Sequence, residues 1–139
     1  MSTFIVDQYP NLLNDTSFKV LCSSPDQIFW DKVTILHRES HRKDNEKIPL
    51  RYARHYYDLF CLAKDKDIKN NAIKNKGVMK RVVDFKLLYY RQPWARYEDI
   101  LNHKIQLIPK DIHINDVEQD YNKMKSMFYC KVQSFDEII

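Results

Sequence analysis

Two segments of this chain, 29–37 and 51–59, place charged side chains where a helix should be apolar. Lys32 shares one predicted helix face with four apolar residues, which are Ile28, Phe29, Val33 and Leu36. Because an unpaired ammonium on a buried face is costly, a carboxylate or a phosphate should meet it. Asp58 is the candidate carboxylate. The alternative is that Lys32 runs along the apolar face and keeps its charged end in water.

Lys86 has the same setting in a later helix, which is predicted to start near Val78 and to end before Pro93. The apolar residues that surround it on the predicted face are Met79, Val82, Val83 and Tyr90. A lysine supplies a compact charge that suits phosphate. Lys86 is therefore a second candidate phosphate ligand, with a solvated lysine as the alternative.

The first segment should lie in a helix that begins at Pro25 and runs to about residue 41. Ser24 suits the N-cap position, and Gln27 follows it at the spacing of a capping box. A polar connector and Pro49 delay the next helix to about 51–63. Because the connection is short, the two helices can pack as an antiparallel pair that brings Lys32 close to Asp58.

Asp58 also has a purely local alternative partner. Arg54 precedes it by four residues, the spacing of a surface ion pair worth roughly 0.2–0.5 kcal/mol on a helix.

The whole pattern predicts a mainly α-helical fold of about five helices with a short strand or hairpin at 17–22. The lysine-rich stretch 64–76 should be a solvated loop or a frayed helix end, although its lysines could touch RNA. A helix is expected to open at Asn115, with a buried face made by Val117, Tyr121, Met124 and Phe128. A short helical piece should lie at 94–101 and an extended segment at 105–109.

The chain ends in a second capping-box pattern, formed by Ser134 and Glu137. A helix that starts there would be interrupted within a turn, which suggests truncation. We therefore expect Phe135, Ile138 and Ile139 to be exposed, or to be covered by a second copy of the chain.

Composition bounds the possible functions. With 139 residues and 44% hydrophobic residues, the chain is expected to form one domain over 1–139, and its net charge of +4 permits nucleotide or nucleic-acid binding without requiring it. Three widely spaced cysteines favour neither a disulfide framework nor a zinc site, and the segment 1–7 does not resemble a signal peptide. No membrane span is predicted, so a reducing cytoplasm is the expected location.

The single glycine, Gly77, excludes the common phosphate-binding loops. The chain has no GxGxxG, no Walker loop and no Gly-Ser turn leading to a DxD pair. Any nucleotide chemistry should therefore be incomplete within this polypeptide.

Two other constellations have weaker support. His37 and His41 share a helix face and could start a metal site, but no third ligand accompanies them, so solvated histidines are expected and no metal site is predicted. Four tyrosines could stack on bases, although aromatic residues at helical spacing are more often core: Tyr56, Tyr57, Tyr89 and Tyr90.

The two opening segments and the motifs that follow them, from about residue 20 to the end, resemble the C-terminal half of the AbiEii/AbiGii nucleotidyltransferase toxin family. The most specific pieces are Phe-Trp-Asp-Lys at 29–32 and Arg-His-Tyr-Tyr-Asp-Leu at 54–59. The resemblance extends through 82–86, 94–97, 107–109, 120–124, 127–128 and 134–138. Asp31 stands where the family usually has glutamate.

This resemblance implies a toxin of a bacterial toxin-antitoxin or phage-exclusion system that transfers a nucleoside monophosphate from a nucleoside triphosphate (NTP) to RNA, with tRNA as the expected acceptor. It implies a catalytic role for Lys32 and Asp58, and nucleotide binding by Lys32, Arg54 and Lys86. The expected partners are a winged-helix antitoxin and a polymerase-β-like N-terminal half that holds most of the Mg²⁺ ligands, or a second copy of the chain. The alternative is a non-enzymatic remnant or interaction domain that binds an antitoxin or a separately encoded catalytic half.

Overall fold

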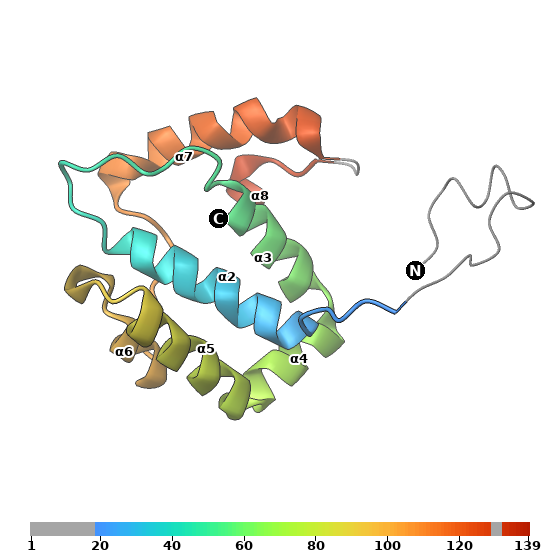
Figure 1. Ribbon diagram of the computed structural model, residues 1–139. Coiled ribbons are helices and arrows are strands. Elements are labelled where there is room, and N and C mark those ends of the chain that lie inside the picture. Colours follow the sequence, from blue (N-terminus) through green and yellow to red (C-terminus); the bar gives the residue numbers. More distant parts are fainter. Residues whose placement is uncertain (1–18, 129–131) are drawn as a thin grey trace, which may run out of the picture.

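The computed structural model describes residues 19–128 and 132–139, and every regular element in these ranges is helical (Figure 1). The α-helices are α2 (Pro25–Ser40), α3 (Arg54–Lys64), α4 (Lys66–Lys74), α5 (Lys76–Tyr89), α6 (Tyr97–Leu101), α7 (Asp111–Met124) and α8 (Phe135–Ile138). Two 3₁₀ turns, η1 (Pro93–Ala95) and η2 (Lys125–Met127), complete the set. The expected mainly α-helical fold is confirmed.

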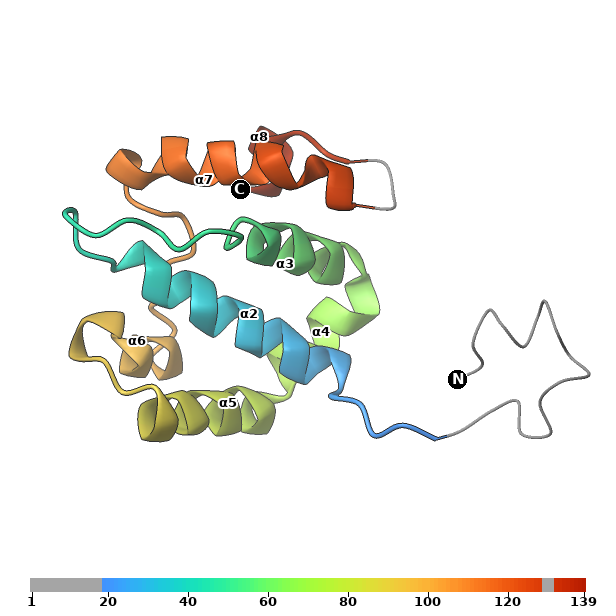
Figure 2. The same cartoon turned by 45° about the horizontal axis from the view of Figure 1, so that its top comes forward.

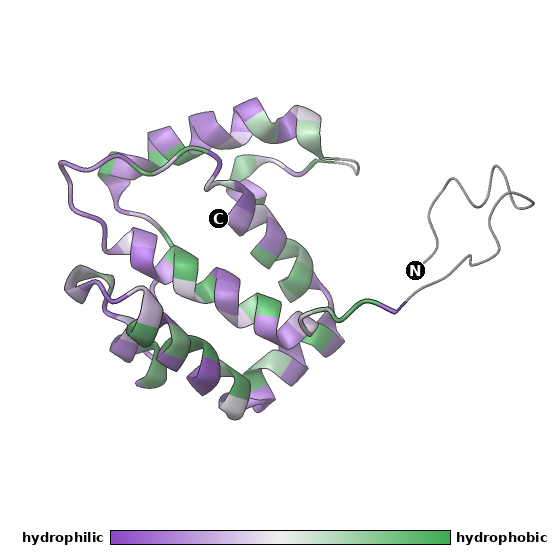
Figure 3. Ribbon diagram, viewed as in Figure 1, coloured by the Kyte–Doolittle hydropathy of each residue, from purple (hydrophilic) through white to green (hydrophobic). Residues whose placement is uncertain are grey.

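The helices are arranged in three tiers, with α2 at the centre (Figure 2). One tier holds α7 and α8, the next holds α3 and α2, and the last holds α5 and α6, while α4 closes one end. Because α2 packs against helices on both sides, its buried residues surround much of its circumference and include Phe29, Trp30, Val33 and Leu36. Figure 3 shows hydrophobic and hydrophilic segments alternating along this helix.

The beginning of α2 follows the sequence expectation closely. Ser24 is the N-cap residue with an extended backbone, and Pro25 occupies the first turn, where its missing N–H is not needed. The expected hydrogen bonds of a capping box are not formed by Ser24. Ile28 was expected on the buried face but is 37% exposed, because it lies beside a surface groove between α2 and α5.

The expected strand near the N-terminus is wrong for the residues that the structure describes. Residues 19–24 have no strand pairing, and Ser17 and Phe18 lie outside the described residues.

The lysine-rich stretch 64–76 is a helix rather than a loop. Asp65 caps α4 because its carboxylate accepts hydrogen bonds from the backbone N–H groups of Asp67 and Ile68. Ala72 on this helix is fully buried. One buried alanine and one cap are weak signals in a polar sequence, and packing against α2 supplies the rest of the stability.

Two helix starts differ from the expected positions. The second helix begins at Arg54 rather than residue 51, because Arg51 has a left-handed backbone with φ of 66°. α7 begins at Asp111, one turn before Asn115. Val117, Tyr121 and Met124 are buried as expected, whereas Phe128 lies beyond the end of α7 and is only partly buried.

The C-terminal helix α8 has the predicted capping contacts, since Glu137 accepts from both the N–H and the hydroxyl of Ser134. Phe135 and Ile138 are buried against α3 and α7, so their expected exposure is wrong, while Ile139 is 36% exposed. The sequence did not reveal that α3 and α7 would leave an apolar surface for this short helix. Among the described residues, no helix is long and apolar enough to cross a bilayer.

Candidate functional site

One turn of α2 contacts three of its neighbouring helices, α3, α4 and α5, through three consecutive residues. Trp30 donates a hydrogen bond from Nε1 to the carbonyl oxygen of Ala72 on α4, at 2.9 Å. Asp31 forms an ion pair with Lys86 on α5, and Lys32 forms one with Asp58 on α3. This placement arises because successive side chains on a helix point about 100° apart, so adjacent residues reach different neighbours.

Lys32 lies where the sequence predicted it. Its Nζ atom is 2.7 Å from Oδ2 of Asp58 and 3.3 Å from Nδ1 of His55. The Lys32 side chain is 18% exposed, whereas Asp58 is 38% exposed, so the ion pair lies at the surface end of the interface between α2 and α3. The expected ion pair is confirmed, and it leaves the charged groups accessible from one side.

His55 is the residue of this site that the sequence did not single out. Burial and the positive charges of Lys32 and Arg54 lower the pKa of His55 to about 4, so the ring is neutral near pH 7. A neutral ring can accept a hydrogen bond from Lys32 through Nδ1, which places its own proton on Nε2. Its position three residues before Asp58 on the same helix face was the signal available in the sequence.

Lys86 is held by Asp31 across the interface between α2 and α5. The distance from Nζ of Lys86 to Oδ1 of Asp31 is 2.6 Å, and only 13% of the lysine side chain is exposed. The same ammonium lies 5.2 Å from the centre of the Tyr90 ring, which is within the range of a cation–π contact. Lys86 is therefore paired rather than freely solvated.

Arg54 begins α3 and is exposed. Asp58 pairs with Lys32 and not with Arg54, so the alternative surface ion pair along α3 is not formed. With Asp31 and Asp58 each neutralised by a lysine, Arg54 gives the cluster a net charge of about +1. The structure thus brings three of the predicted residues into two adjoining ion pairs and places the fourth at the start of α3.

Asp120 fixes the start of α3, which carries His55 and Asp58. Its two carboxylate oxygens accept hydrogen bonds from the backbone N–H groups of Arg51 and Ala53, at 2.8 and 2.9 Å. These contacts hold the left-handed turn at Arg51 and satisfy donors that precede the helix. Asp120 belongs to a segment that resembles the family, but nothing in the sequence indicated this bond.

A buried carboxylate near the C-terminal end of α2 stabilises the loop between α2 and α3. Glu39 is only 2% exposed and pairs with Arg38 at 2.7 Å and with Arg42 at 2.6 Å. Arg38 also donates to the hydroxyl of Tyr52, whose ring meets that of His55 edge-on with centroids 5.1 Å apart. The network therefore reaches His55 through Tyr52.

His37 on α2 and His41, the C-cap residue of that helix, form no metal site with other described residues. The structure contains no group of three or more potential His, Cys, Asp or Glu ligands within 19–128 and 132–139. His37 is fully buried rather than solvated, because Nδ1 accepts from the N–H of Gln106 and Nε2 donates to the carbonyl of Arg96. Burial lowers the pKa of His37, in agreement with a neutral ring. His41 contacts the carbonyl of His37 through Nδ1.

Asp65 and Asp67 form an Asp-x-Asp sequence that is not preceded by a Gly-Ser turn. Asp65 is occupied as the cap of α4. At the ion-pair cluster, Asp31 and Asp58 are each bound to a lysine ammonium. Since Mg²⁺ needs several free oxygen ligands, the lysine-bound carboxylates of Asp31 and Asp58 do not fit a magnesium site.

The four candidate tyrosines divide into two pairs. Tyr56 is buried and donates to the carbonyl of Leu107, and Tyr57 stacks on Phe128 with ring centroids 4.1 Å apart. Tyr89 and Tyr90 are exposed at the end of α5. Core packing is thus the correct interpretation for the first pair only.

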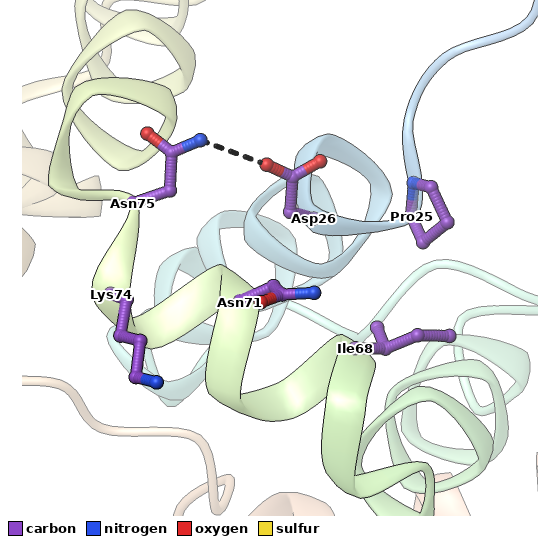
Figure 4. Close-up of a pocket in the computed structure, with 6 residues that line it drawn as sticks. All are labelled: Pro25, Asp26, Ile68, Asn71, Lys74 and Asn75. Atoms are coloured by element: carbon purple, nitrogen blue, oxygen red, sulfur yellow. Dashed lines mark hydrogen bonds between the residues drawn. The ribbon is translucent and has the colours of Figure 1, made fainter.

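Two surface cavities flank the first half of α2. The larger, about 630 Å³, lies between the start of α2 and α4 (Figure 4). Asn75 crosses it to donate a hydrogen bond to Asp26 at 3.2 Å. The smaller, about 340 Å³, lies between α2 and α5 and has Asp31 in its wall. Only this second cavity adjoins the ion-pair cluster.

The comparison with protein families gives a match over almost the whole chain. Residues 3–139 match the family model described as nucleotidyl transferase AbiEii toxin, Type IV TA system. Neither the search of curated proteins nor the search of solved structures found a match. A toxin-antitoxin family indicates an antitoxin as a partner. Because the family match covers nearly all of the sequence, the chain belongs to the AbiEii nucleotidyltransferase toxin family.

Proposed function

We propose that this chain binds the phosphates of an NTP and contributes to the transfer of a nucleoside monophosphate to RNA, with tRNA as the acceptor. The observation that carries the proposal is the ammonium of Lys32, which is held between Asp58 and His55 at an accessible edge of the helix interface. Family membership supports the reaction type.

The ion pairs prepare two lysines for an anionic ligand. Asp58 and Asp31 fix the ammonium groups of Lys32 and Lys86 before any ligand arrives, so less side-chain entropy is lost on binding. A triphosphate carries more charge than a carboxylate and can share or take over these contacts. Exposed Arg54 would add a bidentate donor for a phosphate oxygen.

Neutral His55 supports this role because it leaves the local positive charge on Lys32. A charged imidazole 3.3 Å from the ammonium would repel it and displace it from its partners. His55 thus acts as a positioning residue that accepts a hydrogen bond from Lys32.

Nucleotide transfer in this proposal also requires Mg²⁺, which would supply charge neutralisation for the phosphates. Since Asp31 and Asp58 are bound to lysines, we expect the Mg²⁺ ligands to come mainly from a polymerase-β-like half that carries a Gly-Ser turn and a DxD pair. The residues of this chain would then orient the triphosphate toward that half.

The alternative proposal is a non-enzymatic domain that binds an antitoxin or a separate catalytic half. In that case the two ion pairs would only connect helices, and no NTP would be needed. Binding of nucleotide distinguishes the two proposals directly.

Calorimetric titration with ATP, GTP, CTP and UTP, each with Mg²⁺, tests the proposal. We expect Lys32→Gln to weaken binding at least about ten-fold, equivalent to about 1.4 kcal/mol. Lys80→Gln is the matched control, because Lys80 forms an exposed ion pair with Asp84 on α5. No binding of any NTP, or equal affinity for all variants, would contradict the proposal.

A further inference from the structure

The second half of α5 carries a cluster of exposed apolar side chains that we call the α5 patch, made of Phe85, Leu88, Tyr89 and Tyr90. Their exposed fractions are 49%, 73%, 67% and 52%. Large apolar side chains that are exposed singly need no explanation, but here the Phe85 ring contacts the rings of both tyrosines. The centroid of Phe85 lies 4.8 Å from that of Tyr89 and 6.0 Å from that of Tyr90.

The α5 patch is bordered by a groove of about 340 Å³, at the lower end of the roughly 300–1,000 Å³ of small-ligand sites. Phe85 belongs to both the patch and the groove, and Arg81 stands one turn before it in the groove wall. Ser23 and Gln27 supply polar groups on the opposite wall. The groove thus offers an aromatic face, a cation and hydrogen-bonding groups together.

The charges around the α5 patch favour an anionic partner. Arg81 and Arg91 are exposed and form no ion pair with any residue in the described parts of the chain. The one acid near them on α5, Asp84, is bound to Lys80 at 2.6 Å. Lys86 lies over the ring of Tyr90 at 5.2 Å, so positive charge also reaches the aromatic cluster itself.

The α5 patch is continuous with the candidate phosphate site. Asp31 lines the groove and binds Lys86, whereas Lys32 faces α3. A chain of nucleotides lying on the patch would therefore end beside Lys86, the candidate phosphate ligand on α5.

We propose that the α5 patch and its groove bind the single-stranded end of an RNA, with bases stacked on Phe85, Tyr89 and Tyr90 and phosphates held by Arg81 and Arg91. Aromatic faces flanked by unpaired cations are the chemistry that recognises unpaired nucleotides, because every base has a face that can stack. A protein partner would bury the apolar side chains, but it would also have to supply carboxylates for Arg81 and Arg91. The inference rests on the proposed function only in identifying this RNA as the acceptor.

Fluorescence anisotropy with a labelled, unstructured 12-nucleotide RNA and the full chain, without NTP, tests the inference. Phe85→Leu keeps an apolar side chain but removes the stacking face, and it should weaken binding at least about five-fold. Ile112→Ala is the control, because Ile112 is 60% exposed on α7, away from α5 (Figure 2). Because no nucleotide is present, failure of NTP binding would not affect this result.

The salt dependence of RNA binding is the second measurement. Arg81→Gln should lower the slope of log affinity against log salt by about one, whereas Lys123→Gln on α7 should leave it unchanged. A duplex of the same sequence should compete poorly, since its bases are already stacked. The inference is overturned by absent RNA binding or by equal binding of Phe85→Leu and wild type. A dimer that the Phe85→Leu substitution dissociates would also overturn it, by assigning the α5 patch to self-association.

Discussion

Lys32 donates to Nδ1 of His55, so a charged side chain and a histidine that must remain neutral share one interface. The two residues come from α2 and α3, and Asp58 completes the contact from the next turn of α3. The position of Lys32 therefore depends on His55 remaining uncharged.

Acid should therefore destabilise the protein through His55. The folded pKa is about 4, below the ordinary value of 6.5, so the unfolded chain binds the proton more tightly. Above about pH 6.5, His55 is neutral in both states and does not lower the free energy of unfolding. This free energy falls as the pH decreases below that value, and the loss is complete below about pH 4. The shift corresponds to about 3 kcal/mol.

The measurement is urea unfolding of wild type and His55→Asn between pH 7 and 4. Asn keeps an acceptor near the position of Nδ1 but does not titrate, so the pH-dependent loss should be smaller by about 3 kcal/mol. His37 has a lowered pKa in both proteins, and its contribution cancels in the difference. Identical pH profiles would rule out this role of His55.

The ion pair between Lys32 and Asp58 should contribute moderately to the free energy of unfolding. A fully buried pair loses about 3–5 kcal/mol when one partner is removed, but Asp58 is 38% exposed and water screens the charges. We expect Asp58→Ala to lower the free energy of unfolding by about 1–2 kcal/mol. A double-mutant cycle with Lys32→Met measures the coupling, and a coupling near zero would contradict the pairing.

Helix periodicity and a short connection were sufficient to predict the contact between Lys32 and Asp58. Both signals are local, and two neighbouring helices joined by a short loop have few ways to pack. The partner of Lys86 was not predictable in this way, because Asp31 is more than fifty residues earlier in the sequence. Three-dimensional neighbours across distant helices leave no periodic signal in a single sequence.

The errors in the fold have a common physical origin in tertiary packing. The stretch that forms α4 looks like a loop, since its only fully buried residue is Ala72, and its contacts with α2 are invisible in its composition. Similarly, Phe135 looks exposed because α8 is short, but α3 and α7 cover it. In both cases a distant element supplies the burial.

Asp120 should control the position of α3 without touching any ligand. Asp120→Ala leaves two backbone N–H groups without acceptors and should cost about 1–3 kcal/mol of unfolding free energy. Asp116→Ala, one turn earlier on α7 and exposed, is the control and should change stability little. Thermal unfolding followed by circular dichroism compares the two variants, and equal melting temperatures would exclude the proposed capping role.

The last prediction concerns activity, and it starts from a sequence with one glycine and no Gly-Ser turn leading to a DxD pair. Because the two aspartates at the ion-pair cluster are held by lysines, the purified 139-residue chain should bind NTP weakly but should not transfer nucleotide. Labelled NTP, Mg²⁺ and total tRNA are incubated with the chain, and incorporation into RNA is measured. Transfer that disappears in Lys32→Ala would show a metal site that the present interpretation lacks. Transfer that begins only when a polypeptide with the Gly-Ser and DxD motif is added would show that Lys32 and its neighbours complete a site shared between two halves.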